Sequence, residues 1–364
     1  SGAGYLKSNP DVAADAYFGK HPLEHWWSSG YREGRSYTGA TPTPSQPQPT
    51  VPQGSGEIVS FVRLPECDDP LSCYFAVEWP RFGTYGYQHG QHKSAVYEYP
   101  KKLVARYEAE SVIAMQDGVT LLEKGGLNHR GQIYYGGSLA YEAADWSLCL
   151  QLHKHTDGYY YATGKDYNNK SAPGGWVRSK DGRTWERWGT AQGNDMLLGM
   201  CSDGADLITF GSHGGTDWGS NGSYPVAYRG KTRIMSIPSM VNCGAWAACN
   251  FQGQVYGGLT GSAGVVRLDD QKIVLSRPQH AACFKLLVDK LKGTLLALFF
   301  GEGDTHAEVW ATKDGTSWRQ VGGPLDGTTL FSCYQAGDGT VYLSGGKISQ
   351  GGDGYGRIYK GVRA

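Results

Sequence analysis

Side chains that could bind a ligand gather in a few Gly-rich segments of the sequence. Segments such as "QHGQHK", "GKDYNNK" and "GSHGGTDWGSNG" combine His, Tyr, Trp, Asn and Asp with glycines that favour turns. Aromatic rings stack on the C–H faces of sugars, and planar polar groups hydrogen-bond to sugar hydroxyls. We therefore predict carbohydrate binding. The candidate ligand-binding residues are Tyr85, Tyr87, His89, His92, His129, Asp166, Tyr167, Asn168, Asn169, His213, Asp217, Trp218, Asn221, Asp304, His306, Asp353 and Tyr355.

The same segments leave an enzymatic alternative open. A polysaccharide lyase needs a base, such as His or Tyr, to remove the proton beside a uronate carboxylate, and a cation to neutralise that carboxylate. The sequence offers candidate bases and, as cations, three arginines. The bases are His89, His213 and His306, together with a loop Tyr, and the cations are Arg81, Arg130 and Arg357.

A glycoside hydrolase is the second enzymatic alternative. It would need two carboxyl groups, about 5–5.5 Å apart in a retaining enzyme or about 6.5–9.5 Å apart in an inverting one. The loop carboxylates that could form such a pair are Asp166, Asp217, Glu302, Asp304 and Asp353. Sequence spacing fixes none of these distances, so enzyme activity and catalytic residues stay undetermined.

Metal and cofactor chemistry has no clear pattern in the sequence. No CxxC pair or zinc-type His spacing occurs, and "GEGDTH" and "GGDGYG" lack the carboxylate spacing of an EF-hand. The Gly-rich segments also lack the Lys-Ser/Thr ending of a phosphate-binding loop. We therefore expect no metal and no cofactor.

Charge and hydropathy exclude two kinds of partner. The 34 basic residues balance the 34 acidic ones, so no long-range field favours nucleic acid or an anionic membrane. The strongly apolar run "GTLLALFF" is far shorter than the roughly 20 residues that span a bilayer. The first residues, "SGAGYLKSNP", do not show the basic and apolar regions of a signal peptide. We expect neither nucleic-acid binding nor a membrane span.

The 8 cysteines do not indicate a disulfide framework. Most of them, such as the one in "AACFKLL", sit in apolar stretches, where cysteine behaves as a small buried hydrophobic residue. Cys67 and Cys73 bracket a turn in "CDDPLSC" and could form a disulfide.

A repeat of about 44 residues organises most of the chain. Each copy contains a Gly turn and then a short apolar strand, as in "TDGYYYATGK" and "GDGTVYLSGGK". The turn glycines are Gly118, Gly158, Gly204, Gly253, Gly293 and Gly339, with a degenerate copy upstream in "DDPLSCYFAVEW". Repeats of this length are typical of β-propellers, whose four-stranded blades bury their faces against one another. We predict seven blades over residues 58–364, with Ile58–Val62 supplying the last strand and closing the ring.

Two hairpins resemble a known propeller motif. "GWVRSKDGRTWERWG" and "AEVWATKDGTSWRQVGG" resemble the Asp-box of sialidase-like propellers, although the commonest form has one more residue between Asp and Gly. The resemblance implies that Asp181 and Asp314 accept backbone N–H groups within the turn, and that Trp185 and Trp318 pack between strands. It also implies ligand binding at the opposite face, on the loops that join the second and third strands. No sialidase catalytic residue can be matched.

Residues 1–37 resemble a different module. Their pattern, Y-L-x-x-N-P-D-V followed by P-L-x-H-W and G-x-x-E-G-R, is similar to a short helical module of bacterial surface or secreted proteins and phage structural proteins. The resemblance implies attachment or display through a protein partner that docks on 1–37. Residues 38–57 are rich in Pro and small polar residues and form a predicted linker.

Together these features predict an all-β, seven-bladed β-propeller with a small N-terminal α-helical hairpin. The predicted role is recognition of a surface polysaccharide, as by an adhesin or a phage receptor-binding protein. The predicted location is extracellular, on a cell surface or on a virion. The alternative is a polysaccharide-degrading enzyme, a lyase before a hydrolase. A third candidate, a scaffold that binds only other proteins, would be expected to have apolar loops rather than loops with groups that match hydroxyls.

Overall fold

The computed structural model describes Ala14 and residues 56–85, 93–123, 130–166, 169, 171–214, 222–301, 306–327, 329–348 and 354–364. The chain divides into two units, Ser1–Gln53 and Gly54–Ala364. The strands that the structure describes all lie in the second unit. Apart from Ala14, the predicted helical module at 1–37 lies outside the described residues, as do residues 38–55 of the predicted linker.

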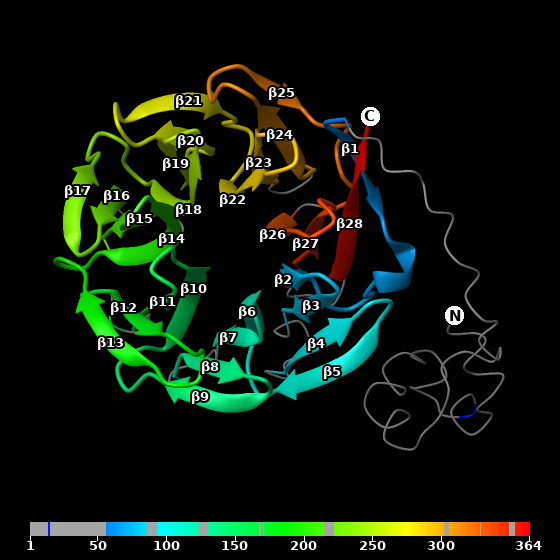
Figure 1. The fold of residues 1–364 in the computed structure, drawn as a ribbon, viewed down its shortest axis with the longest axis horizontal. Helices are drawn as coiled ribbons and strands as arrows, with labels where there is room; N and C mark the ends of the chain where they lie inside the picture. The colour runs from blue at the N-terminus through cyan, green and yellow to red at the C-terminus, as the bar shows by residue number, and fades with distance from the viewer. Residues whose placement is uncertain are drawn as a thin grey trace. The chain divides into compact units, whose positions relative to one another are not determined.

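Antiparallel meanders of four strands surround a central opening (Figure 1). The first comprises β2 (Tyr74–Glu78), β3 (Arg81–Thr84), β4 (Ser94–Glu98) and β5 (Lys102–Tyr107). Next come β6 (Ser111–Gln116), β7 (Val119–Glu123), β8 (Gln132–Tyr135) and β9 (Ser138–Glu142), then β10 (Leu148–Lys154), β11 (Tyr160–Lys165), β12 (Gly175–Ser179) and β13 (Glu186–Thr190).

The second half of the chain continues the same arrangement. Its strands are β14 (Met196–Asp203), β15 (Asp206–His213), β16 (Tyr224–Arg229), β17 (Thr232–Ser236), β18 (Gly244–Phe251), β19 (Gln254–Thr260), β20 (Gly264–Arg267), β21 (Lys272–Ser276), β22 (Ala282–Asp289), β23 (Thr294–Phe300), β24 (Glu308–Thr312), β25 (Trp318–Gln320), β26 (Thr329–Gln335), β27 (Val341–Lys347) and β28 (Tyr355–Arg363). The first strand of each meander borders the central opening, and the fourth lies at the periphery (Figure 1).

The number of separate sheets differs from the prediction. The strands form five hydrogen-bonded sheets, because β6–β9 join β10–β13 and β18–β21 join β22–β25. The joins are single pairings, of Glu123 with Leu148 and of Thr260 with Ala282. At these points the second strand of one meander reaches the first strand of the next. The prediction of seven separate blades is therefore wrong, since a sequence period does not reveal hydrogen bonds between repeats.

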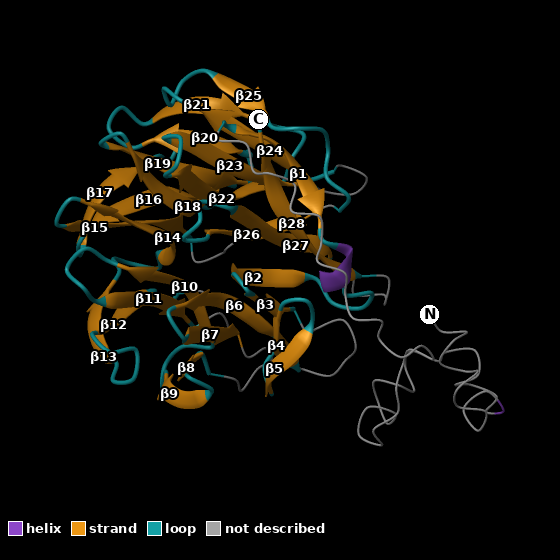
Figure 2. Ribbon diagram, turned by 45° about the vertical axis from the view of Figure 1, so that its right-hand side comes forward, coloured by secondary structure: helices purple, strands orange, loops and turns teal. Residues whose placement is uncertain are grey.

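The predicted all-β fold with a helical hairpin also needs correction, because the described residues contain no such hairpin and, of 1–37, include Ala14 alone. Among the described residues, helical backbone is confined to Ala14 and to the 3₁₀ turn η2 (Pro65–Cys67), which lies next to β28 (Figure 2). No helix in the described part of the chain is long and apolar enough to cross a membrane. The fold is an all-β propeller.

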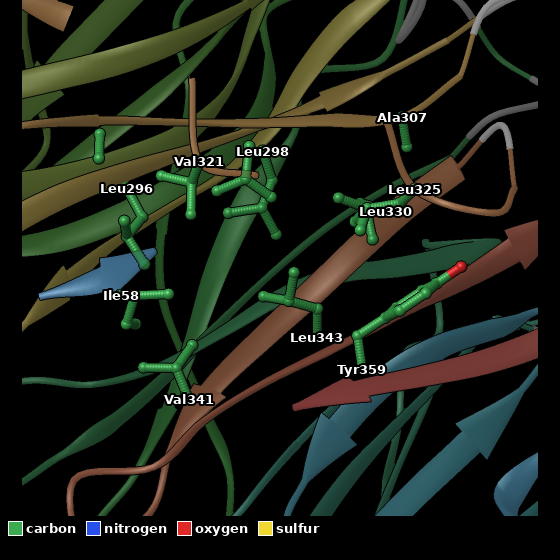
Figure 3. Packing of buried hydrophobic residues seen from close by; sticks show 12 residues of the cluster. Ile58, Leu296, Leu298, Ala307, Val321, Leu325, Leu330, Val341, Leu343 and Tyr359 are labelled. Atoms are coloured by element: carbon green, nitrogen blue, oxygen red, sulfur yellow. The ribbon is translucent and has the colours of Figure 1, made fainter. Parts of the chain in front are cut away.

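The N-terminal strand of the ring closes it, as the sequence predicts. β1 (Ile58–Arg63) pairs antiparallel with β28 and completes a sheet with β26 and β27 (Figure 1). Ile58 is buried in an apolar cluster that also contains Leu296, Leu298 and Leu343 (Figure 3). The closing sheet is therefore fixed by its hydrogen bonds and by packing against β23.

A buried ion pair also holds the closing sheet. Arg363 in β28 donates two hydrogen bonds to the carboxylate of Asp289, at the end of β22, at 2.8 Å each. Both side chains are about 1% exposed. Gln335 donates to Asp289, and Arg363 also donates to the carbonyl oxygen of Gly339. These bonds compensate much of the cost of removing the two charges from water.

The two Asp turns have the predicted geometry. The Oδ1 atom of Asp181 accepts the backbone N–H groups of Arg183 and Thr184 at 2.8 Å. Asp314 accepts the N–H groups of the two equivalent residues, and the backbone hydrogen bonds lower the pKa of its carboxyl. Trp185 and Trp318 pack in the apolar clusters of their own sheets.

The cysteines whose side chains the structure describes are free thiols. Cys67 and Cys73 are both buried and unbonded, so the disulfide that their spacing allows is not formed. Burial raises the pKa of each of these thiols to about 12. Cys201, Cys283 and Cys333 are also free and buried or partly buried, as predicted.

Replacing Arg363 tests the closing ion pair. We expect Arg363→Met to lower the free energy of unfolding by about 3–5 kcal/mol, because Asp289 would be left as an unpaired buried charge. Urea unfolding of the full chain measures the change. The control is Arg319→Met, which removes an exposed pair with Glu57 and should cost less than about 1 kcal/mol. Equal losses in the two variants would contradict a special role for Arg363.

Candidate functional site

The two ends of the ring differ in the loops and turns that lie there. At one end, here called the loop face, second strands lead into third strands and fourth strands lead into the next meander. At the other end, the turn face, lie the Asp181 and Asp314 turns and the glycine turns between first and second strands. Because strands alternate in direction, the described strand ends that flank the predicted ligand-binding loops lie at the loop face.

Each innermost strand contains a β-bulge close to its loop-face end. In β10 the register shifts between Cys149 and Gln151, and in β22 it shifts between Cys283 and Lys285. A bulge places an extra residue opposite one partner residue and redirects its side chain. Each bulge contains a large apolar residue, and the bulge in β14 also includes Gly199. The large apolar residues are Phe75, Ile113, Leu150, Leu198, Trp246, Phe284 and Phe331.

Six of these side chains form an apolar collar, which we define as Phe75, Leu150, Leu198, Trp246, Phe284 and Phe331. Phe331 lies 3.9 Å from Phe75 and 5.2 Å from Phe284 between ring centroids. Trp246 lies 5.0 Å from Phe284 and also packs against the cluster of Leu150 and Leu198. The collar therefore joins strands around the central opening. Ile113, at the equivalent bulge of β6, packs instead into the cluster of its own sheet.

Further apolar side chains lie beside the collar at the loop face. Tyr85, at the end of β3, stacks on Phe75 with ring centroids 4.6 Å apart and an angle of 11° between the rings. Phe300, the last residue of β23, and Ile348, directly after β27, pack against the same cluster. Phe75, Tyr85 and Trp246 remain partly exposed. The centre of the loop face thus has an aromatic floor, and predicted residue Tyr85 belongs to it.

A polar network lies farther out on the loop face, around the fully buried Asp195. Asp195 lies directly before β14, in the connection from β13. Its Oδ1 atom is 2.7 Å from Nδ1 of His213 and 2.7 Å from an N–H group of Arg233, and its Oδ2 atom accepts from the hydroxyl of Tyr228. Burial, and then Asp195, raise the pKa of Tyr228 above its usual value, so that hydroxyl stays protonated.

This network orients the imidazole of His213. A carboxylate can only accept, so the bond to Asp195 requires a hydrogen on Nδ1 and leaves Nε2 as the proton-accepting nitrogen. The ring stacks on Tyr224 at 4.6 Å, and its side chain is 31% exposed. His213 is therefore held by a buried carboxylate while part of its ring reaches solvent. This arrangement suits a general base.

Lys165, at the end of β11, lies close to this network. Its ammonium donates to the carbonyl oxygen of Asn194, the neighbour of Asp195, and its side chain is fully buried. Burial lowers the pKa of Lys165 to about 8, although Asp195 and Asp166 oppose this shift. Perturbed pKa values of this kind are common at functional sites.

A second polar cluster lies near β24. Glu308 accepts from Arg277 at 2.7 Å and from the indole N–H of Trp310 at 2.8 Å. The Arg277 guanidinium lies over the Trp310 ring. His280 is buried, its Nε2 donates to the carbonyl oxygen of His306, and burial lowers the pKa of its imidazole. The side chain of predicted residue His306 is exposed, and only its backbone takes part in this cluster.

The other described candidates have separate surroundings. Asn169 accepts the backbone N–H of Ser171 and so shapes its own loop. The ring of Tyr355 lies under the guanidinium of Arg357 at 4.2 Å. The structure therefore places Tyr85 at the floor, and His213 and Asp166 close to Lys165. The described candidates do not all come together in one site. Outside the described residues lie Tyr87, His89, His92, His129, Tyr167, Asn168, Asp217, Trp218, Asn221, Asp304 and Asp353, as does Glu302.

The arginines predicted to accompany a catalytic base have other partners. Arg81 lies 3.6 Å from Glu98, and Arg130 lies 3.7 Å from Glu142. Arg357 lies 3.6 Å from carboxylate oxygens of both Asp68 and Asp326. The cation beside His213 is instead Arg233. Its guanidinium lies 3.1 Å from Nδ1 without a hydrogen bond, because Nδ1 carries the hydrogen that Asp195 accepts.

Sequence reasoning missed the collar and most of the polar network. Asp195 lies in "AQGNDM", a connection between meanders, whereas only loops between second and third strands were considered. Arg233 and Tyr228 lie within strands and reach Asp195 through long side chains. The collar did leave a signal: one large apolar residue near the start of every innermost strand, as in "YFAV", "AWAA" and "CFKL". Among the described residues, no group of three His, Cys, Asp or Glu side chains could hold a metal ion.

Known structures support the fold class. The chain is similar to a streptogramin B lyase (10% identity, TM-score 0.51, covering 82% of this chain and 96% of that one). It is also similar to a catalytically inactive His-to-Ala variant of virginiamycin B lyase from Staphylococcus aureus with quinupristin (11% identity, TM-score 0.53, 82% and 98%). A chain of the mitotic checkpoint complex matches at 9% identity and TM-score 0.50, over 89% and 97%.

At these identities the likeness shows the β-propeller fold alone. No family model matches the sequence, and no curated protein matches it. The resemblances to Asp-box propellers and to the N-terminal display module therefore gain no support from known families. The geometry of the Asp turns stands on the structure itself.

The pKa of Lys165 predicts a dependence of stability on pH. A lysine with a folded-state pKa of about 8, against 10.5 when unfolded, penalises folding below pH 8, and the penalty disappears as the pH rises toward 10.5. We expect the Lys165→Met variant to have a higher free energy of unfolding than the original protein at pH 7. This difference in free energy should shrink by about 3 kcal/mol by pH 10.5. Urea unfolding at both pH values measures it. The control is Lys102→Met, at an exposed position, whose difference in unfolding free energy from the original protein should not change with pH. If the difference for Lys165→Met is also the same at both pH values, the lowered pKa of Lys165 is refuted.

Proposed function

We propose that the loop face binds a carbohydrate over the apolar collar. The observation that carries this proposal is the partly exposed group of Phe75, Tyr85 and Trp246 at the centre of the face. Sugars expose C–H faces that stack on such rings. The surrounding carboxylate, imidazole and guanidinium groups of the two polar clusters match the hydroxyls of a sugar. A polysaccharide on a cell surface is the ligand class that we propose.

Replacing the floor residues tests carbohydrate binding. Full-length protein is applied to an array of bacterial and algal polysaccharides, and calorimetry measures the affinity for any that bind. We expect Trp246→Leu and Tyr85→Ala to weaken binding about tenfold each, since each loses a stacking ring. Tyr159→Ala, in the turn between β10 and β11 at the turn face, should leave affinity unchanged. Unchanged affinity in both floor variants, or no bound polysaccharide, would refute the proposal.

A lyase is the second candidate function, and the His213 network favours it. The Nε2 atom of His213 would take the proton from the carbon beside a uronate carboxylate. The electron pair of that C–H bond then forms a C=C bond as the neighbouring C–O bond breaks, and the departing oxygen takes up a proton. Arg233, whose side chain is 22% exposed and which also pairs with Asp195, supplies the cation. Two of the structural neighbours are also lyases, and one of them is inactive in a His-to-Ala variant.

Turnover of uronate polysaccharides distinguishes the two functions. Formation of unsaturated uronate is followed by its ultraviolet absorbance. If the protein is a lyase, His213→Ala should abolish turnover, and Asp195→Asn should lower kcat about 10²-fold or more by releasing the imidazole. Arg267→Met, at the end of β20, is the control and should retain full turnover. Carbohydrate binding without any absorbance change would leave recognition as the function.

A further inference from the structure

The side chain of Lys285 crosses the central opening directly beneath the collar. Lys285 follows the collar residue Phe284 in β22, and Gln151 follows the collar residue Leu150 in β10. The Nζ atom of Lys285 donates to Oε1 of Gln151 at 2.8 Å. β14 and β18 separate these two strands around the ring (Figure 1). The bond must therefore run through the space that the innermost strands enclose, on the turn-face side of the collar.

No counter-ion for Lys285 is present in the described part of the chain. Its hydrogen-bond partner Gln151 is a neutral amide, and no carboxylate of the described residues lies within 4.0 Å of its Nζ atom. The nearby thiol of Cys333 has its pKa raised to about 12 by burial and is neutral at pH 7. Burial also lowers the pKa of Lys285. The Lys285 side chain is partly buried. A partly buried cation without a counter-ion is costly, and a bound anion would lower that cost.

The other groups near Lys285 are neutral and polar. Burial lowers the pKa of His153 to about 4, with His155 and Lys285 contributing further, so its imidazole is uncharged at pH 7. Its Nε2 atom is 2.9 Å from the hydroxyl oxygen of Ser202, which is also 2.7 Å from Nδ1 of His155. These groups can form hydrogen bonds near Lys285. The carboxylate of Asp157, in the turn after β10, acts on His153 but forms no ion pair with Lys285.

Donor capacity remains at this position. An ammonium group has three N–H donors, and the bond to Gln151 uses one. The side-chain amide of Gln151 can donate as well, since its oxygen is the atom that accepts from Lys285. We infer that the position of the Lys285–Gln151 bond, between β22 and β10 on the turn-face side of the collar, binds a small inorganic anion, with Lys285 as its charged ligand and Gln151 as a second donor. The collar separates this site from the loop face, so the inference does not depend on the proposed carbohydrate binding.

Anion-dependent stability tests the site. Thermal unfolding of the full chain is measured in sodium chloride, in sodium phosphate and in a bulky sulfonate salt at equal ionic strength. An anion that binds only the folded protein raises Tm in a saturable way. We expect a rise of a few degrees in chloride or phosphate relative to the sulfonate, and comparison of the first two salts identifies the preferred ion. Lys292→Met, in the exposed turn after β22, should keep this response, whereas Lys285→Met should lose it.

The alternative is that Lys285 only ties β22 to β10. In that case Lys285→Met would change Tm equally in all three salts, and this result would overturn the inference. An identical response to anions in Lys285→Met and the original protein would overturn it as well.

A direct readout avoids dependence on the folding of one variant. The chloride NMR line should broaden when the original protein is added. It should narrow again when phosphate is added, if both ions share the site. The Gln151→Met variant should broaden the line at least several-fold less than the original protein does. Absence of broadening by the original protein, together with no specific effect of phosphate on Tm, would exclude the site.

Discussion

The pairing of β1 with β28 is the constraint on which the rest of the structure depends. It joins the start of the described ring to its end, and each sheet can bury both faces only when the ring is complete. The entropic cost of joining distant segments grows slowly with chain length, so a modest number of contacts can hold such a closure. Here those contacts are the strand pairing, the burial of Ile58 and the buried pair of Arg363 with Asp289.

Closure brings the bulged residues to a common centre. In an isolated sheet, the redirected side chains of Phe284 and Trp246 would face water, and burying them requires the innermost strands of neighbouring sheets. The same geometry places Lys285 below the collar and Tyr85 above it. The bulge, repeated in each innermost strand, therefore separates the partly exposed rings of the loop face from the Lys285–Gln151 bond on the turn-face side.

Much of the fold could be predicted from the sequence because turns leave local signals. Gly158 and Gly204 have φ angles of 85° and 60°, which glycine tolerates best, and their spacing revealed the repeat. The partner of β28 was predictable because the last meander lacked a strand. The joining of sheets through Glu123 and Leu148 was not predictable, because it depends on how far two strands extend in space.

The candidate site was less accessible to prediction for a related reason. Loop composition identified Tyr85 and His213, which lie where loops begin, but it gave no sign of the partners of His213. Asp195 is 18 residues away in the sequence from His213, and Arg233 is 20 residues away on the other side. Such contacts arise from the packing of strands and connections, and a single sequence does not encode them in any periodic pattern.

The collar also limits how far the meanders behave as independent modules. In an open array of repeats, each unit touches only its neighbours, and units can be exchanged or duplicated with little effect on distant ones. In this propeller, Trp246 of β18 packs against a cluster that includes Leu150 of β10, although β14 intervenes. Changes in the volume of one bulged side chain are therefore transmitted across the axis, and natural or engineered variation at these positions has to be concerted.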